Sequence, residues 1–200
     1  MKHLKILIIA IALPLATVAQ DVNSSRLTSQ SDALKVLAET SGDLNNDGIK
    51  DVATLFESSP LMLTIFLSNK DGSHQTLNYE YIFEELPKSD EFVVVEYSLN
   101  YTKTKCLMIT VSSFATAGSW ESPTCKYIFR YQNGDFYLIG ESHESLYRNS
   151  GETTEVSINY LTGKQCTTEG NAFKKKKPKV KWEKIGKKPL RSIGEVKLQL

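Results

Sequence analysis

The stretch that decides the fold is residues 127–140, which reads YIFRYQNGDFYLIG. It contains two runs dense in β-branched and aromatic residues, a composition that favours strands. The dipeptide Asn133-Gly134 separates them, and both of its residues tolerate the positive φ that a two-residue type I′ turn requires. The stretch therefore predicts a β-hairpin with strands at 125–132 and 136–140.

Runs of the same kind recur on both sides of this hairpin. They predict further strands at 51–57, 61–68, 92–101, 106–113, 155–160 and 180–185. Asp71-Gly72 and Thr162-Gly163 fit tight reversals between antiparallel strands. Segments 32–39 and 77–86 fit short helices, although residues 35–39 are also compatible with a strand. We therefore expect an all-β or β-rich α+β fold, a single antiparallel sandwich or partly open barrel with at most one or two short helices.

Residues 1–19 have the pattern of a cleaved secretory signal peptide. Lys2 and Lys5 precede an apolar run at 6–13, and Thr17 and Ala19 place small side chains before the cleavage point. The alternative is an uncleaved anchor, but the run is shorter than the roughly 20 apolar residues that span a bilayer. We expect a periplasmic or secreted protein with a disordered stretch at 20–31, a single β-rich domain at 32–200 and no later transmembrane segment.

Charge is unevenly distributed along the chain. Residues 20–173 hold 11 Lys and Arg against 21 Asp and Glu, a net charge of −10, whereas the basic C-terminal segment 174–191 holds 10 against one, a net charge of +9. Lysines of this segment alternate with Val180 and Trp182, which favours a charged edge strand that resists aggregation. The alternative is a site for a polyanion. Since an exported protein seldom meets nucleic acid, we expect no nucleic-acid partner.

The mature chain contains three cysteines, Cys106, Cys125 and Cys166. Export implies an oxidising compartment, so the simplest expectation is one disulfide and one free thiol. The sequence does not choose the pair. None of the cysteines lies at short metal-ligand spacing from a histidine, which argues against a zinc site.

The segment 43–51 places oxygen-bearing side chains at alternate positions. Ca²⁺ takes six to eight oxygen ligands, and a tightly coiled loop with a glycine at its bend, here Gly48, turns alternate residues inward. The predicted ligands are the side chains of Asp43, Asn45, Asp47 and Asp51 and the backbone carbonyl of Ile49. The alternative is a metal-free hairpin whose Asp and Asn side chains accept turn amides. We expect Ca²⁺ in a structural role.

This loop resembles the short calcium loops of FG-GAP and related repeats, which have the pattern D-x-[DN]-x-D-G-x-x-D and lead directly into a buried strand. Only one copy is present, and no longer repeat supports a propeller. The order of signal peptide, acidic loop, Trp120, the 127–140 hairpin and a lysine-rich end is similar to that of small exported bacterial proteins without an assigned activity. The resemblance implies export and a calcium loop but no reaction.

A search for catalytic sets predicts no catalytic residue. His143, between Glu141 and Glu144, is the best single acid/base candidate, but an exposed histidine in a loop is the simpler interpretation. Glu84-Glu85 is more simply a solvated face than a carboxylate pair. Trp120 and the outward half of an aromatic set are candidates for a sugar or peptide platform, the set being Tyr127, Phe129, Tyr131, Phe136 and Tyr137.

The sequence as a whole predicts an exported, calcium-stabilised, non-enzymatic module that binds a cell-envelope component or a protein partner. The alternatives are a hydrolase acting on envelope polymers or a protein inhibitor of such an enzyme. A concave pocket with converging carboxylates, or a partner group for His143, would favour the enzyme. A flat, exposed aromatic patch around Trp120 would favour binding, and a rigid protruding loop would favour inhibition.

Overall fold

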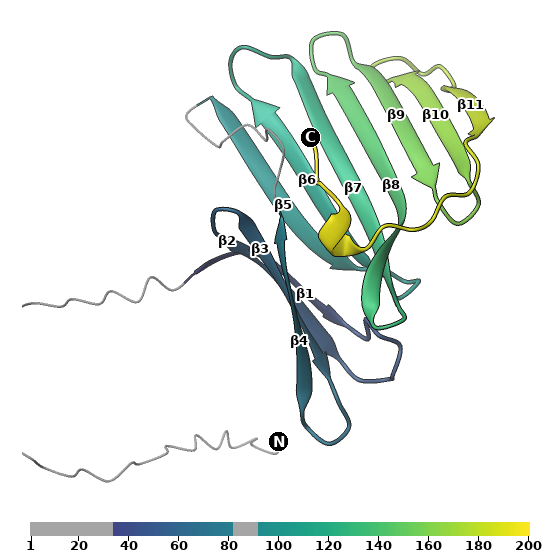
Figure 1. Cartoon of the computed structure of the whole chain (residues 1–200). Coiled ribbons are helices and arrows are strands. Elements are labelled where there is room, and N and C mark those ends of the chain that lie inside the picture. The colour runs from purple at the N-terminus through teal and green to yellow at the C-terminus, as the bar shows by residue number, and fades with distance from the viewer. Residues whose placement is uncertain (1–33, 82–91) are drawn as a thin grey trace, which may run out of the picture. The chain divides into compact units, whose positions relative to one another are not determined.

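The computed structural model describes residues 34–81 and 92–200, which belong to one compact unit. Within them the protein is all-β, with two antiparallel sheets that do not close into a barrel (Figure 1). The predicted signal peptide, the stretch 20–31 and Glu84-Glu85 lie outside the described residues. No helix among those described is long and apolar enough to cross a membrane.

Each sheet follows the order of the chain. The first contains β1 (Lys35–Gly42), β2 (Asp51–Glu57), β3 (Leu61–Ser68) and β4 (His74–Tyr81). The second contains β5 (Val93–Tyr101), β6 (Leu107–Ala115), β7 (Glu121–Gln132), β8 (Asp135–Tyr147), β9 (Glu152–Asn159), β10 (Lys164–Asn171) and β11 (Lys179–Lys184). Every neighbouring pair is antiparallel, because short turns reverse the chain each time.

The two sheets share one hydrophobic core. Leu55 and Ile65 of the first sheet and Ile109 and Phe129 of the second have no exposed surface and belong to the same cluster. Gly42 allows β1 of the first sheet to lie close to Tyr101 of β5 in the second sheet. A Cβ at this position would lie 2.3 Å from the ring of Tyr101.

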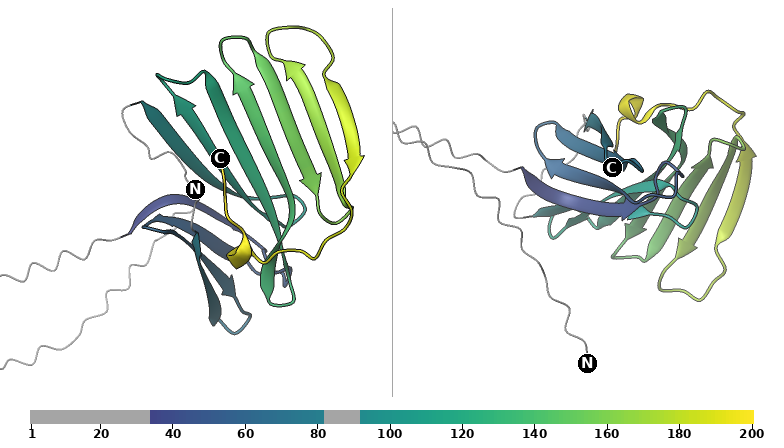
Figure 2. Two further views of the ribbon diagram at one scale, coloured as in Figure 1. Left: turned by 45° about the horizontal axis from the view of Figure 1, so that its top comes forward. Right: turned by 90° about the horizontal axis from the view of Figure 1, so that it is seen from below.

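The chain after β11 returns across the second sheet, as the yellow segment in Figure 2 shows. The amide of Leu138 in β8 donates to the carbonyl of Arg191 at 2.9 Å. A single 3-10 turn, η1 (Ile193–Glu195), follows, and the Tyr127 hydroxyl then exchanges hydrogen bonds with the backbone of Gln199 at 3.0 and 2.8 Å. Leu198 is fully buried, so this segment is part of the core.

The predicted 127–140 hairpin is confirmed. Gln132 pairs with Asp135 across the turn, and Asn133 and Gly134 have φ values of +52° and +85°. One β-bulge interrupts the pair, because Ile128 is opposite Gly140 whereas Phe129 is opposite Leu138. Ile139 is therefore an extra residue in β8, and its carbonyl accepts the amide of Tyr160 at 3.0 Å.

Both helix predictions are wrong within the described residues. β1 replaces the predicted helix 32–39, since pairing with the buried strand β2 outweighs the helix preference of residues such as Leu37 and Ala38. Residues 77–81 belong to β4, and the rest of the predicted helix 77–86 lies outside the described residues. β10 was not predicted.

The predicted disulfide is also wrong, because all three cysteines are free. Cys106 precedes β6, Cys125 lies in the core on β7, and Cys166 lies on β10. The register places Cys166 in line with Ser157 and Ser142, whose side chains face the side of the sheet opposite to Cys125.

Candidate functional site

The loop predicted to bind calcium folds around the carboxylate of Asp51. Asp51 is fully buried. Its Oδ2 accepts the amides of Leu44 and Asn45 at 2.8 and 3.3 Å, and its Oδ1 accepts the amide of Ser68 at 2.9 Å. Burial raises the pKa of Asp51 although these amides act in the opposite direction. The side chain therefore ties the loop to the end of β3.

Asn45 and Asp47 stabilise the bend of the loop through one another. The Asp47 amide donates to Asn45 Oδ1, and Asn45 Nδ2 donates to Asp47 Oδ2, both at 3.0 Å. The Ile49 amide donates to Asp47 Oδ1 at 2.8 Å. These are the local bonds by which Asn and Asp side chains shape turns.

Lys105 supplies a positive charge to the same loop. It lies in the turn between β5 and β6 with φ at +56°, and its Nζ is 2.8 Å from Asp43 Oδ2 and 2.6 Å from Asn46 Oδ1. The hydrogen bond from Lys105 holds the pKa of Asp43 below its ordinary value. Asp43 Oδ1 is buried and has no hydrogen-bond partner among the described residues.

The five predicted ligands share one loop, and in this arrangement three of their side chains already have partners within the protein. Asp47 and Asp51 accept backbone amides, and an ammonium group already neutralises Asp43. A divalent ion bound by Asp43 Oδ2 would compete with the Lys105 ammonium for that oxygen. In residues 34–81 and 92–200, no three or more Cys, His, Asp or Glu side chains are grouped so that they could hold a metal.

A second region is an exposed patch at one end of the second sheet. Val94 of β5 and Phe114 of β6 are opposite one another, and each is 45% exposed. Trp120, directly before β7, is 62% exposed. We define the Trp120 patch as Val94, Phe114, Trp120 and Arg148. Of the other predicted aromatics, Tyr127, Phe129 and Phe136 are buried, Tyr131 packs against the core and Tyr137 is partly buried.

Arg148 holds the Trp120 patch together. Its Cζ lies 4.1 Å from the ring centroid of Phe114 and 5.8 Å from that of Trp120, within cation–π range. Nη2 donates to the carbonyls of Ala115 and Ser119, and the Arg148 amide donates to the Trp120 carbonyl at 2.9 Å. One guanidinium therefore fixes the loop that carries Trp120.

A shallow groove adjoins the Trp120 patch. Its volume is about 320 Å³, and it is lined by Val94, Glu96, Ser112, Ser113 and Phe114. Because Val94 and Phe114 belong to both features, the groove extends the apolar surface toward a carboxylate and two hydroxyls.

The third region is a thiol–imidazole–carboxylate cluster on β7 and β8. Cys125 and His143 are direct cross-strand neighbours, and Cys125 Sγ lies 3.1 Å from His143 Nδ1. His143 Nε2 lies 3.9 Å from Glu141 Oε1. The predicted loop position of His143 is wrong, since it lies within β8. The Cys125 contact first, and Glu141 second, raise the pKa of His143 to about 10.

Glu141 is itself held by two groups from outside the hairpin. The Tyr160 hydroxyl donates to Glu141 Oε1 at 2.8 Å, and Arg191 Nη2 lies 3.7 Å from Oε2. Burial acts to raise the pKa of Glu141, but the contacts with His143, Tyr160 and Arg191 outweigh it, and the pKa falls below its ordinary value. Glu141 therefore remains a carboxylate facing the imidazole.

Sequence reasoning considered His143 but missed Cys125 as its partner. The register set by the Asn133-Gly134 turn, continued without interruption, would place Ser142 opposite Cys125. The bulge at Ile139 shifts β8 by one residue and brings His143 there instead. No turn signal in the sequence marks this bulge.

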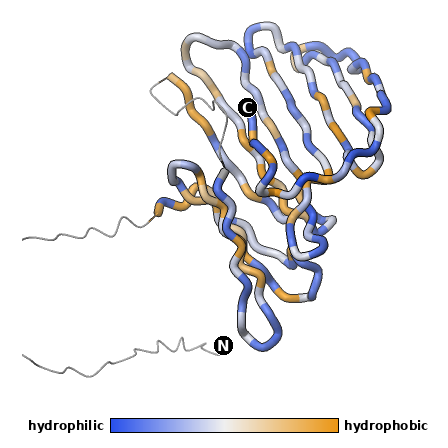
Figure 3. Tube along the Cα trace, viewed as in Figure 1, coloured by the Kyte–Doolittle hydropathy of each residue, from blue (hydrophilic) through white to orange (hydrophobic). Residues whose placement is uncertain are grey.

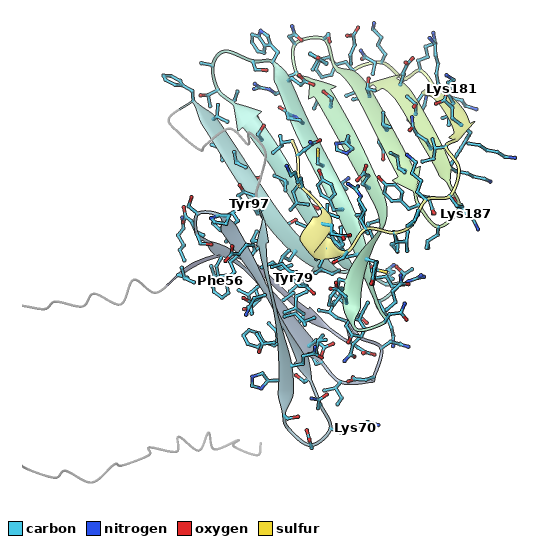
Figure 4. The ribbon with its side chains drawn as sticks, in the orientation of Figure 1. Phe56, Lys70, Tyr79, Tyr97, Lys181 and Lys187 are labelled. Atoms are coloured by element: carbon cyan, nitrogen blue, oxygen red, sulfur yellow. The ribbon has the colours of Figure 1, made fainter. Side chains whose placement is uncertain are left out.

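The basic segment forms the open edge of the second sheet, as predicted. Among the strands that the structure describes, β11 pairs with β10 alone, and all six of its residues are exposed, among them Trp182 at 66%. Figure 3 shows predominantly hydrophilic colouring around β10 and β11, and Figure 4 places Lys181 and Lys187 there. The lysine groove, a hollow of about 350 Å³, is lined by Lys174, Lys176, Lys177, Lys179, Glu152, Thr153, Thr154, Glu169, Gly170 and Asn171.

Comparison with known proteins gives no match to any family model, curated protein or solved structure. The fold and these four regions are therefore the grounds for a functional proposal.

Proposed function

We propose that this protein is an exported, non-enzymatic binding module that docks a protein partner on the Trp120 patch. The observation that carries the proposal is the exposed Trp120 side chain on a loop fixed by Arg148. Export rests on the signal-peptide pattern of residues 1–19.

The geometry of the patch favours binding because the loop that carries Trp120 is already held in place and does not have to become ordered when a partner binds. Arg148 bonds three carbonyl groups in and beside the loop, so Trp120 is held before a partner arrives. A preorganised surface loses less conformational entropy when it binds. Three exposed apolar side chains from separate segments gather near Arg148, since Phe114 and Trp120 both contact it and Val94 pairs with Phe114.

The composition of the patch favours a protein over a polymer. Trp and Arg are enriched at the energetic centres of protein interfaces, where aromatic side chains fill desolvated pockets. Glu96 in the adjoining groove adds one carboxylate. The partner surface should therefore offer apolar side chains beside a basic residue or another hydrogen-bond donor.

An enzyme acting on a polymer is less well supported. The Cys125–His143 pair meets our own criterion for a partner of His143, but Cys125 is only 2% exposed and is packed in the core. A polymer chain cannot bring a scissile bond to that sulfur without opening the sheet. The exposed aromatic patch meets the criterion for binding directly.

Peptide selection against the mature chain tests the proposal. Displayed peptides are enriched on the wild type, and the affinity of each selected peptide is measured by titration. Trp120→Ala should weaken binding at least about tenfold, as expected for a central interface aromatic. Trp182→Ala is the matched control, since Trp182 is comparably exposed and lies on β11.

Selected peptides that bind Trp120→Ala as tightly as the wild type would contradict the proposal. Cosedimentation with purified envelope polymers is the second arm. Retention on a polymer that Trp120→Ala abolishes, without any peptide that depends on Trp120, would assign the patch to a polymer.

A further inference from the structure

The Cys125–His143–Glu141 cluster has no role in binding at the Trp120 patch, yet its geometry is chemically specific. Cys125 Sγ faces Nδ1 of His143 at 3.1 Å, while Glu141 Oε1 faces Nε2 at 3.9 Å. A neutral imidazole carries a proton on only one nitrogen, whereas an imidazolium donates from both. An imidazolium between a thiolate and a carboxylate satisfies both contacts at once.

We propose that Cys125 is a reactive thiolate, paired with the His143 imidazolium, whose substrate is hydrogen peroxide. A thiolate is the nucleophilic form of cysteine, and a neighbouring cation favours it over the thiol. The cluster is thus an oxidation site that goes beyond the proposed binding function.

The surroundings support the charged form of the pair. Tyr127 on β7 and Glu141 on β8 lie against the imidazole, and Glu141 in turn contacts Tyr160, after β9, and Arg191 of the C-terminal segment. Burial raises the pKa of Tyr160 to about 12, so its hydroxyl keeps its proton and donates to Glu141. The pKa of His143, raised to about 10 by Cys125 and Glu141, keeps the ring protonated at neutral pH.

The low exposure of the Cys125 sulfur favours a small reagent. Cys125 is 2% exposed, but the His143 side chain in contact with it is 39% exposed. The imidazole therefore lies between the buried sulfur and the surface. We expect a reagent as small as hydrogen peroxide to reach the sulfur more readily than a bulky hydroperoxide.

The reaction balances with the groups present and one peroxide. The Cys125 thiolate attacks one peroxide oxygen, so that an S–O bond forms and the O–O bond breaks. Sulfur loses two electrons to the peroxide, and the leaving hydroxide takes the proton of the His143 imidazolium to become water. Cys125 becomes a sulfenic acid and His143 becomes neutral. Since Cys166 lies on the opposite face of the sheet, it is not placed to condense with that sulfenic acid.

Peroxide oxidation of the full chain, stopped by denaturation in the presence of dimedone and followed by peptide mass spectrometry, tests the proposal. Cys166 is the internal reference, because it is more exposed than Cys125. We expect Cys125 to react at least about tenfold faster than Cys166 despite its burial. His143→Gln should slow Cys125 by at least about tenfold, and Cys166→Ser should leave its rate unchanged.

Two further measurements keep the test decisive if His143→Gln does not fold. In the wild type the Cys125 rate should change less than about threefold between pH 6 and 8, whereas an ordinary thiol gains more than about tenfold. Cumene hydroperoxide should react much more slowly than hydrogen peroxide. Faster reaction at Cys166, a steep pH dependence at Cys125, or equal rates for wild type and a folded His143→Gln would overturn the proposal. None of these outcomes depends on the Trp120 patch.

Discussion

Lys105 brings an ammonium group to the loop 43–51 from another part of the chain. Its Nζ touches Asp43 and Asn46, although Lys105 itself comes from the turn between β5 and β6. Carboxylates that lie close together repel one another, and a nearby cation relieves that repulsion. Lys105 provides such a cation beside Asp43 without any ligand from solution.

Replacing Lys105 tests whether the loop depends on this ammonium group. We expect Lys105→Met to lower the thermal midpoint by at most a few degrees, because the lysine is half exposed and its ion pair is screened by water. Chelator should leave the wild-type midpoint unchanged. Calcium should stabilise Lys105→Met more than the wild type, because removal of the ammonium leaves the carboxylates without a counter-charge. Calorimetric melts in calcium or chelator measure both effects.

Lys103→Met is the matched control, since Lys103 is an exposed lysine in the same turn. Its melts should follow the wild type in both buffers. A wild-type midpoint that falls in chelator, together with loss of that sensitivity in Asp47→Ala, would instead support the calcium-bound loop predicted from the sequence.

The β7–β8 pair is the element from which the rest of the second sheet extends. Its turn requires two successive residues with positive φ, a conformation that costs ordinary L-residues energy. At Gly134 a Cβ would meet nothing within 4 Å. Any cost of substitution there is therefore conformational and not steric.

Gly134→Ala should lower the free energy of unfolding by about 1–2 kcal/mol, the cost of placing an alanine in the left-handed region. Gly134→Asn should cost less, because asparagine tolerates that region. Urea unfolding followed by circular dichroism measures both. Equal stability of Gly134→Ala and the wild type would show that the turn relaxes to another type.

Strands with an apolar signal were predictable, and strands without one were not. β2 and β3 were predicted with the bounds that the structure has, because consecutive apolar residues and flanking turns mark them. β10 reads KQCTTEGN and has no apolar period, so only its neighbours β9 and β11 define it. β1 is rich in helix-favouring residues and becomes a strand through pairing with β2.

The candidate sites also divide into features that a local sequence pattern predicts and contacts that no local pattern predicts. The charged edge at β11 follows from local composition and is predicted from it, and composition also makes Trp120 a candidate, whereas its exposure comes from the structure. The contacts of Lys105 with Asp43, and of Cys125 with His143, join residues far apart in the chain. They depend on strand order and on a bulge, which no local pattern encodes.

Across the whole molecule, charge is segregated in sequence and in space. The lysines of the C-terminal segment gather at one edge of the second sheet, where four of them line the lysine groove. Glu152 and Glu169 lie in the same groove and reduce its net charge. Charged edges protect a sheet against pairing with other chains, and the same lysines attract anionic polymers.

Retention on heparin separates these roles. We expect the wild type to bind heparin and to elute as the salt concentration rises. The slope of log affinity against log salt should become shallower by about one for each ion pair that a substitution removes. Replacing Lys174, Lys176 and Lys177 by glutamine should shift elution to lower salt. The triple change at Lys184, Lys187 and Lys188 removes the same charge outside the groove and should shift it less. Equal shifts would show that total charge, and not the groove, sets retention.

The extra residue Ile139 affects more than its own strand. β9, β10 and β11 are all aligned through the part of β8 that follows it, so the bulge sets which side chains share each face over four strands. Loss of the Ile139 codon would straighten β8 and leave His143 opposite Cys125, because Gly140 would then follow Leu138 directly and stay opposite Ile128. Gain of one residue between Gly140 and His143, without a second bulge to absorb it, would instead turn the imidazole to the other face although neither Cys125 nor His143 had mutated.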